Sequence, residues 1–223
     1  CKANTSAILE LIREMEEQHA KIMVLPELCI TGYTCQDLFL QRRLLDSAWE
    51  SLLVIARETE DVDALIFVGL PMRLNGKLYN VAAVLNQGNI IGFVPKTYIP
   101  NYNEFYERRH FTSGEDVWTD VTIGEESVPF GSNLIFTCES LPELTVGAEI
   151  CEDLWAPQPP SVNLAQGGAH IIVNLSASDE TVGKASYRRD LVRGQSARLV
   201  CGYVYATAGE GESSQDLVFG GHN

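Results

Sequence analysis

The chain has 223 residues, of which 45% are hydrophobic and 21% are charged, and its formal net charge at pH 7 is −14. This length and composition predict one α/β domain with a sizeable core. The acidic balance argues against a nucleic-acid partner, because binding a phosphate backbone needs clustered lysine and arginine. No apolar run approaches the length of a membrane span, so we expect a soluble chain whose partner is a small molecule or a protein.

The first predicted elements are helices and buried strands in alternation. An amphipathic helix begins near Asn4, a fair N-cap, and ends near His19. The apolar run 21–25 predicts a buried strand that stops at Pro26, so that Glu27 stands at its carboxyl end. A helix and a further buried strand follow, at about 49–56 and 64–70. This order predicts layers of helices packed on sheets.

The next strands are antiparallel, because Asn75-Gly76 and the segment 86–89 are turn signals. The predicted strands lie at about 65–73, 78–85 and 90–94. The last of them stops at Pro95 and is followed at once by Lys96. It is therefore the second strand that ends in a proline and a charged residue.

Beyond these strands the pattern turns irregular. Residues 98–128 are aromatic and charged, which indicates a long functional loop or, alternatively, a surface insertion or an oligomer contact. The remaining elements are strand, strand, helix, strand, helix, strand and strand, at about 133–137, 144–150, 161–166, 170–175, 184–199, 203–206 and 217–219. Residues 209–213 predict a turn rather than a nucleotide-binding loop, because they lack the Walker lysine and their acidic side chains repel phosphate.

The strand at 144–150 ends at Cys151, which acidic residues flank. A cysteine at a strand end suits a nucleophile, because the turn lifts the thiol off the sheet and the N–H groups after it can face an oxyanion. A small buried hydrophobic residue is the alternative, and it is the commoner role of a free cysteine.

The six cysteines form no Cys-x-x-Cys pair and have no histidine at metal-ligand spacing. We therefore predict neither a metal site nor a disulfide framework, and expect reduced thiols in a cytoplasmic protein. The four histidines lie in no motif that pairs one of them with Cys151, so a cysteine–histidine pair stays open but unselected. They are His19, His110, His170 and His222.

Three strand endings together suggest one site. Ligands of open α/β sheets bind beyond the carboxyl ends of the strands, so Glu27, Lys96 and Cys151 can converge although they are far apart in sequence. A glutamate can take the thiol proton, a lysine can stabilise a thiolate and an oxyanion, and a cysteine can attack a carbonyl carbon. Such a set suffices for amide hydrolysis.

The motifs around these residues resemble the nitrilase, or carbon–nitrogen hydrolase, superfamily. They are Leu-Pro-Glu-Leu at 25–28, Pro-Lys at 95–96 with Tyr-Glu-Arg-Arg-His-Phe at 106–111, and Cys-Glu-Asp-Leu-Trp at 151–155. Five segments also resemble a narrower family, the glutaminase domains of glutamine-dependent NAD synthetases. They are 26–28, 31–33, 101–102, 104–107 and 208–213. The resemblance covers nearly the whole chain.

The resemblance implies a four-layer α-β-β-α sandwich and a glutaminase that works through a cysteine thioester. It assigns Glu27 as general base, Cys151 as nucleophile, and Lys96 with the N–H of Glu152 as oxyanion stabiliser, while Glu107 supports the lysine. The two ends of glutamine would be held by Tyr33, Tyr102, Glu152, Ser178 and Lys184.

The resemblance also sets expectations about the whole protein. Residues 1–223 would be a single domain and part of a longer chain, lacking terminal strands and a C-terminal ATP-dependent synthetase domain. That domain would bind nicotinic acid adenine dinucleotide, ATP and magnesium, and no cofactor is expected in this chain. L-Glutamine, the synthetase domain and further copies of the protein are the expected partners. The alternatives are a free-standing amidase or nitrilase of the same superfamily and a catalytically inactive scaffold domain.

Overall fold

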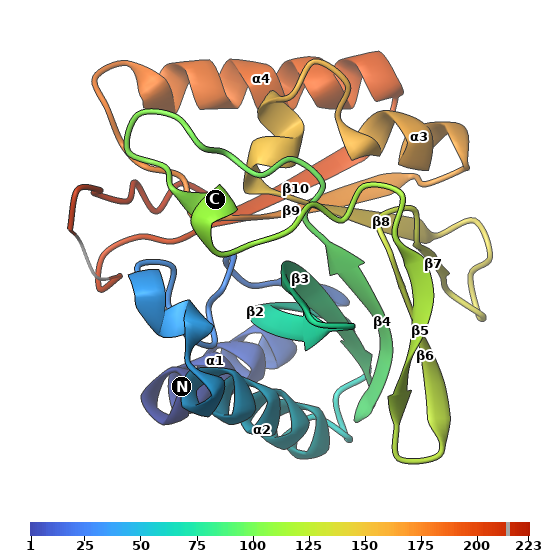
Figure 1. Ribbon diagram of the computed structural model, residues 1–223. Helices are drawn as coiled ribbons and strands as arrows, with labels where there is room; N and C mark the ends of the chain where they lie inside the picture. Colours follow the sequence, from blue (N-terminus) through green and yellow to red (C-terminus); the bar gives the residue numbers. More distant parts are fainter. Residues whose placement is uncertain (213–214) are drawn as a thin grey trace.

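The computed structural model describes residues 1–212 and 215–223, which fold into four layers with helices outside two stacked β-sheets (Figure 1). The first sheet contains, in spatial order, β1 (Ile22–Val24), β2 (Leu65–Leu74), β3 (Lys77–Asn86), β4 (Asn89–Pro95), β6 (Glu126–Gly131) and β5 (Trp118–Ile123). The second contains β10 (Gly202–Thr207), β9 (Ile171–Ser176), β8 (Thr145–Ile150) and β7 (Ile135–Thr137). The α-β-β-α sandwich expected from the sequence is confirmed.

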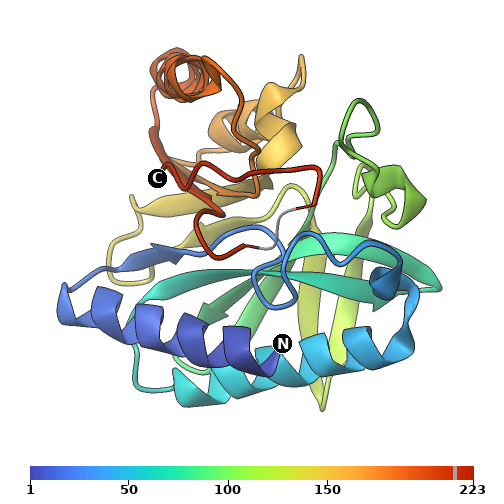
Figure 2. The ribbon, with the colours of Figure 1, turned by 90° about the vertical axis from the view of Figure 1, so that its left-hand side faces the viewer.

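Helices cover the outer face of each sheet. Figure 2 shows α1 (Lys2–Glu17) and α2 (Arg42–Glu58) on one outer face and α4 (Lys184–Leu199) on the opposite one, where α3 (Pro160–Gln166) also lies. The first pair buries Ile12, Leu52 and Ile55 against the first sheet. None of the helices within the described residues is long and apolar enough to cross a membrane.

The middle of the sandwich is a core between the two sheets. Phe67 of β2 and Val94 of β4 lie in one cluster with Ile150 of β8 and Val173 of β9, and all four are buried. Full burial of side chains of this size contributes about 1.5–3 kcal/mol each. Because this core fixes β4 against β8, it also fixes the carboxyl ends of these strands, where Lys96 and Cys151 lie.

Most of the predicted elements are present. The strands expected at 65–73, 78–85 and 90–94 are confirmed as the antiparallel β2, β3 and β4, and the helix expected at 184–199 is α4. The strands expected at 144–150, 170–175 and 203–206 are present as β8, β9 and β10, and the structure shows that they pair in parallel.

The structure corrects the start of the first helix. The helix begins at Lys2, so the prediction that Asn4 is its N-cap is wrong. Asn4 lies in the first turn, and its side-chain amide donates to the carbonyl oxygens of Cys29 and Ile30, at 3.0 and 3.2 Å. The residue therefore fastens α1 to the loop that follows Glu27.

The structure also corrects the predicted loop at 98–128. Its second half forms the antiparallel hairpin of β5 and β6, which turns at Gly124 with a φ of +62°. The paired Val121 and Val128 are buried, but Trp118 in the same hairpin is 68% exposed. Apolar residues alternate along both strands, at Val121 and Ile123 and at Val128 and Phe130, and pack on the core, so the sequence carries the signal of a strand here.

The predicted strand at 217–219 is also wrong, because Phe219 forms only an isolated bridge with Asp179 among the described residues. The turn predicted at 209–213 is present at Glu210 and Gly211, while Ser213 lies outside the described residues.

Gly69 of β2 allows the close approach of the turn that carries Glu27. A Cβ at this position would lie 2.4 Å from the nitrogen of Leu28 and 2.6 Å from the carbonyl oxygen of Pro26. We expect Gly69→Ala to lower the free energy of unfolding by about 1–3 kcal/mol, because backbone atoms must move to admit the methyl group. Urea denaturation measures the change.

The matched control is Gly194→Ala in α4, where a Cβ would meet no atom within 4 Å. We expect this variant to be as stable as the wild type, or more stable by about 1 kcal/mol, because alanine favours a helix over glycine. An unchanged stability of Gly69→Ala would contradict the packing described here.

Candidate active site

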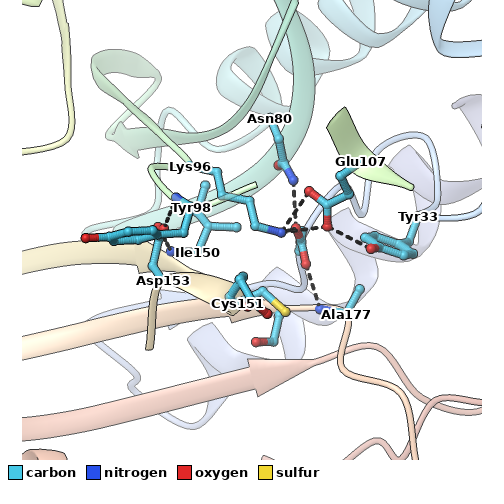
Figure 3. A network of polar contacts seen from close by, with 12 residues as sticks. Tyr33, Asn80, Lys96, Tyr98, Glu107, Ile150, Cys151, Asp153 and Ala177 are labelled. Carbon is cyan, nitrogen blue, oxygen red and sulfur yellow. Dashed lines mark hydrogen bonds and ion pairs between the residues drawn. The ribbon is translucent and has the colours of Figure 1, made fainter. Parts of the chain in front are cut away.

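A lysine ammonium is buried between two carboxylates where the two sheets meet (Figure 3). Lys96, directly after β4, donates from Nζ to Oε1 of Glu27 at 2.6 Å. It also donates to Oε1 and Oε2 of Glu107, at 2.7 and 2.9 Å. The structure therefore brings together Glu27 and Lys96, which follow strand ends, and Glu107, which the family resemblance implied as the partner of the lysine.

Further donors satisfy both carboxylates. Asn80 Nδ2 donates to Oε1 of Glu27 at 2.6 Å, and the N–H of Ala177 donates to its Oε2 at 3.0 Å. The hydroxyl of Tyr33 donates to Oε1 of Glu107 at 2.7 Å. Such hydrogen bonds are needed because a buried charge without partners strongly destabilises the folded state.

The charges of the cluster shift its pKa values. Burial alone would lower the pKa of Lys96, but the negative charges of Glu107 and Glu27 outweigh burial and raise it well above its usual value. Burial raises the pKa of Glu107 to about 7, against the opposing effect of Lys96. The lysine is therefore an ammonium ion at neutral pH, and Glu107 titrates near neutrality.

Cys151 lies at the turn from β8 into a 3-10 helix, Cys151–Trp155. Its φ of +45° is in the left-handed region, which is rare for a residue with a side chain. Burial raises the pKa of its thiol well above the usual value and Glu27 raises it further, while Lys96 opposes both. Figure 3 shows the thiol of Cys151 on the same side of the network as the side chain of Lys96.

Asp153 joins the turn at Cys151 to the end of β4. Its Oδ1 accepts the N–H groups of Tyr98 and Thr97, at 2.7 and 3.1 Å, and its Oδ2 accepts the N–H of Ile150 at 2.9 Å. Sequence reasoning missed this role of Asp153. An acidic side chain at the third position of a helical turn often accepts the backbone N–H of the residue that precedes the turn.

A cavity of about 370 Å³ opens at Cys151. Its lining includes Tyr102, Glu152, Ser178 and Lys184, four of the five residues expected to hold a substrate. The fifth, Tyr33, does not line this cavity and points its hydroxyl at Glu107. Two other cavities, of about 350 and 440 Å³ beside α2, contain none of the predicted site residues.

The cavity presents the carboxyl group of Glu152 and the ammonium group of Lys184 at separate points. Glu152 accepts the Tyr102 hydroxyl at 2.9 Å, and burial raises the pKa of its carboxyl. Lys184 forms an ion pair with Asp179, and its Nζ lies 5.4 Å from the centre of the Trp155 ring. Opposite charges at two points can bind a zwitterion in one orientation.

The described part of the cavity lining contains no histidine, so the structure gives Cys151 no such partner there. His110 instead contacts the exposed Asp37, and His222 contacts Arg188. Among the described residues, no cluster of three or more histidine, cysteine, aspartate or glutamate side chains is arranged to hold a metal ion.

Comparisons with known proteins match nearly the whole chain. The model of the carbon-nitrogen hydrolase family matches residues 2–222. The glutamine-dependent NAD(+) synthetase of Mycobacterium tuberculosis is 42% identical over 219 residues, which are 98% of this chain and 32% of that protein. The same enzyme of Thermotoga maritima is 32% identical over 223 residues, 99% of this chain and 34% of that protein. The chain thus spans about a third of these curated relatives.

Solved structures agree in fold. A glutamine-dependent NAD(+) synthetase from Cytophaga hutchinsonii superposes with a TM-score of 0.86 and 34% identity, over 98% of this chain and 35% of that one. An amidase from Nesterenkonia sp. superposes with a TM-score of 0.72 and 19% identity, over 98% and 73% of the respective chains. At that identity the amidase shows the shared fold alone.

Asp153 allows a sharp test of the link between β4 and the turn at Cys151. In Asp153→Asn an amide NH₂ would face at least one of the three backbone N–H donors. We expect the free energy of unfolding to fall by about 1–3 kcal/mol, because a buried donor loses its acceptor. Urea denaturation measures the loss.

The control for this variant is Asp120→Asn, whose exposed side chain accepts the Ser127 hydroxyl, at 2.7 Å. Its stability should stay within about 0.5 kcal/mol of the wild type. Equal stabilities of the two variants would show that Asp153 does not hold the turn.

Proposed function

The chain belongs to the carbon-nitrogen hydrolase family, and we propose that it is a glutamine amidohydrolase that releases ammonia for NAD(+) synthesis by another part of the same protein. The observation that carries the proposal is the buried Lys96 between Glu27 and Glu107, beside a thiol that opens on a cavity. The relatives in which this region is a third of a glutamine-dependent NAD(+) synthetase support the choice of substrate and product.

In the first half-reaction, Glu27 takes the proton of the Cys151 thiol while the sulfur attacks the amide carbon of the glutamine side chain. The Lys96 ammonium and the N–H of Glu152 stabilise the negative oxygen of the tetrahedral intermediate. Glu27 then gives the proton to the leaving nitrogen. The carbon–nitrogen bond breaks, ammonia leaves, and a glutamyl thioester remains on the sulfur.

In the second half-reaction, Glu27 takes a proton from water and the resulting hydroxide attacks the thioester carbonyl. The same two donors stabilise the oxyanion. The carbon–sulfur bond breaks, the proton returns to the sulfur, and glutamate leaves. Both halves therefore use one base and one oxyanion site, and the protein ends as it began.

The charge balance of the cluster explains why two carboxylates surround one lysine. The thiol pKa is raised by burial, so the thiol is protonated at rest and needs a base at the moment of attack. When Glu27 accepts that proton it becomes neutral, but Glu107 still neutralises Lys96. Above the pKa of Glu107, the buried cation therefore keeps a counter-charge at every stage, and an unpaired one would cost several kcal/mol.

The cavity suits the remainder of glutamine. We propose that Glu152, with Tyr102, binds the α-ammonium group and that Lys184, with Ser178, binds the α-carboxylate. The contact of Tyr33 with Glu107 supports a role in holding the cluster rather than the substrate.

We also propose the wider setting in which this reaction serves. The ammonia would pass to a synthetase domain that binds nicotinic acid adenine dinucleotide, ATP and magnesium, whereas the hydrolysis itself uses side chains of this chain alone. The protein would act in the cytoplasm as a homo-oligomer. The rival function is a free-standing amidase or nitrilase, and substrate preference separates the two.

The first test is ammonia release from L-glutamine compared with simple aliphatic amides and nitriles. We expect kcat/KM for glutamine to be higher by roughly 10⁴-fold, because polar groups built to bind the amino acid stay unpaired without it. Cys151→Ala should abolish release, and Glu27→Gln and Lys96→Ala should each lower it by ~10²-fold or more. Cys201→Ala, which removes a thiol outside the cavity, is the matched control. Faster hydrolysis of aliphatic amides or nitriles would overturn the proposal.

The second test is the pH dependence of hydrolysis. Burial raises the pKa of Glu107 to about 7, so below this pH the carboxyl is neutral and leaves Glu27 as the only counter-charge of Lys96. We expect kcat/KM to rise as the pH increases through about 7. Glu107→Gln should have a low kcat/KM that does not rise near pH 7, since an amide does not titrate.

Glu115→Gln is the control for this measurement, because Glu115 is an exposed residue that does not line the cavity at Cys151. Its pH profile should keep the step. A step that persists unchanged in Glu107→Gln would show that another group controls the acid limb.

A further inference from the structure

The backbone N–H of Cys151 has a side-chain partner that the reaction above does not use. It donates to Oδ1 of Asn174 at 3.1 Å, and the same oxygen accepts the hydroxyl of Ser176 at 2.9 Å. Asn174 and Ser176 lie on β9, directly beside β8, and both are fully buried. The hydroxyl of Ser176 also interacts with the thiol of Cys151. One carboxamide oxygen thus holds two groups at the nucleophile.

The carboxamide of Asn174 has one satisfied orientation. Its NH₂ group and the N–H of Cys151 are both donors, so the oxygen must face Cys151. On the other side the NH₂ donates to the hydroxyl of Tyr203 at 3.1 Å, and that hydroxyl donates to Glu149. The second oxygen of Glu149 accepts the N–H of Ser161 at 2.8 Å. A buried carboxylate therefore sets the direction of every bond in the chain that ends at Cys151.

The backbone at Cys151 needs such support. Its φ of +45° is strained for a residue with a Cβ, and strain of this kind persists only where the surroundings over-determine the conformation. Asp153 holds the N–H of Ile150, and Asn174 holds the N–H of Cys151. Side chains from two different elements therefore hold two consecutive backbone N–H groups at the nucleophile.

We propose that Asn174 is the positioning residue of the nucleophile, which holds the N–H of Cys151 and the hydroxyl of Ser176 so that the thiol faces Glu27 and Lys96. A consequence follows for the oxyanion. Because Asn174 occupies the N–H of Cys151, the next N–H, that of Glu152, is the first one left for the substrate, and early N–H groups of a helical turn have no partner within it. The catalytic part of this inference rests on the proposed hydrolysis of glutamine, but the placement of the thiol does not.

The test compares Asn174→Ala with Asn86→Ala, an asparagine far from the cavity whose side chain donates to the carbonyl of Ala64 at 3.1 Å. Three quantities are measured per folded protein: kcat for glutamine, KM for glutamine, and the rate at which iodoacetamide alkylates Cys151 across a range of pH. We expect Asn174→Ala to lower kcat and the alkylation rate by ~10²-fold with KM little changed, as misplacement of a reacting group does. Asn86→Ala should change neither rate.

A second pair of variants tests the direction of the hydrogen bonds. Asn174→Asp keeps the oxygen that faces Cys151 but loses the donor to Tyr203, and it places a carboxylate near Glu149. Adding Glu149→Gln restores a satisfied chain of reversed direction, in which the new amide donates to Tyr203 and Tyr203 donates to residue 174. We expect the double variant to recover at least ~10-fold of the kcat lost in Asn174→Asp, as residues of one hydrogen-bond network couple.

Each outcome decides the inference. Wild-type kcat and alkylation in Asn174→Ala would overturn it, and so would a double variant no faster than Asn174→Asp. If Asn174→Ala does not fold, Tyr203→Phe replaces it, because the NH₂ group of Asn174 then loses its acceptor and the carboxamide is held from one side only. Unchanged alkylation of Cys151 in that variant would overturn the inference. A wild type that does not hydrolyse glutamine would refute the proposed function alone, since alkylation reports the thiol without that substrate.

Discussion

The site depends on one interaction, the burial of the Lys96 ammonium between the carboxylates of Glu27 and Glu107. Removing such a charge from water costs several kcal/mol, and the cost is offset only where opposite charges and hydrogen bonds surround it. The same arrangement lets Glu27 change charge during the proposed reaction, because Glu107 remains as the counter-charge. Stability and chemistry therefore impose the same requirement on this part of the fold.

Each sheet supplies half of the site, and polar contacts join the halves. Lys96 follows β4 of the first sheet, and Cys151 follows β8 of the second. Asp153 binds the backbone after β4, and the N–H of Glu27 donates to the carbonyl of Ser176 at the end of β9, at 3.2 Å. The core between the sheets thus sets the distance between thiol, base and ammonium.

Sequence alone predicts the parts of this protein whose signals are local. Apolar periodicity reveals α1 and α2, turn signals separate the strands β2 to β4, and a proline after a buried strand marks Glu27 and Lys96. The hairpin of β5 and β6 is missed although its apolar residues alternate, because it directly follows an irregular segment rich in aromatic and charged residues. The roles of Tyr33 and Asp153 are missed for another reason, because their partners are distant in sequence. Tyr33 and Glu107 are 74 residues apart, and Asp153 and Thr97 are 56 residues apart. No propensity of a single residue encodes a distant partner.

The most direct test of the central claim, that Cys151 is the nucleophile activated by Glu27 and Lys96, is mass spectrometry of the protein after incubation with an electrophilic analogue of glutamine. A single adduct is predicted on the peptide that contains Cys151, formed more slowly when L-glutamine competes and strongly slowed in Glu27→Gln and Lys96→Ala. An adduct on Cys29 or Cys35 instead, or labelling of Cys151 at the wild-type rate in Glu27→Gln, would contradict it.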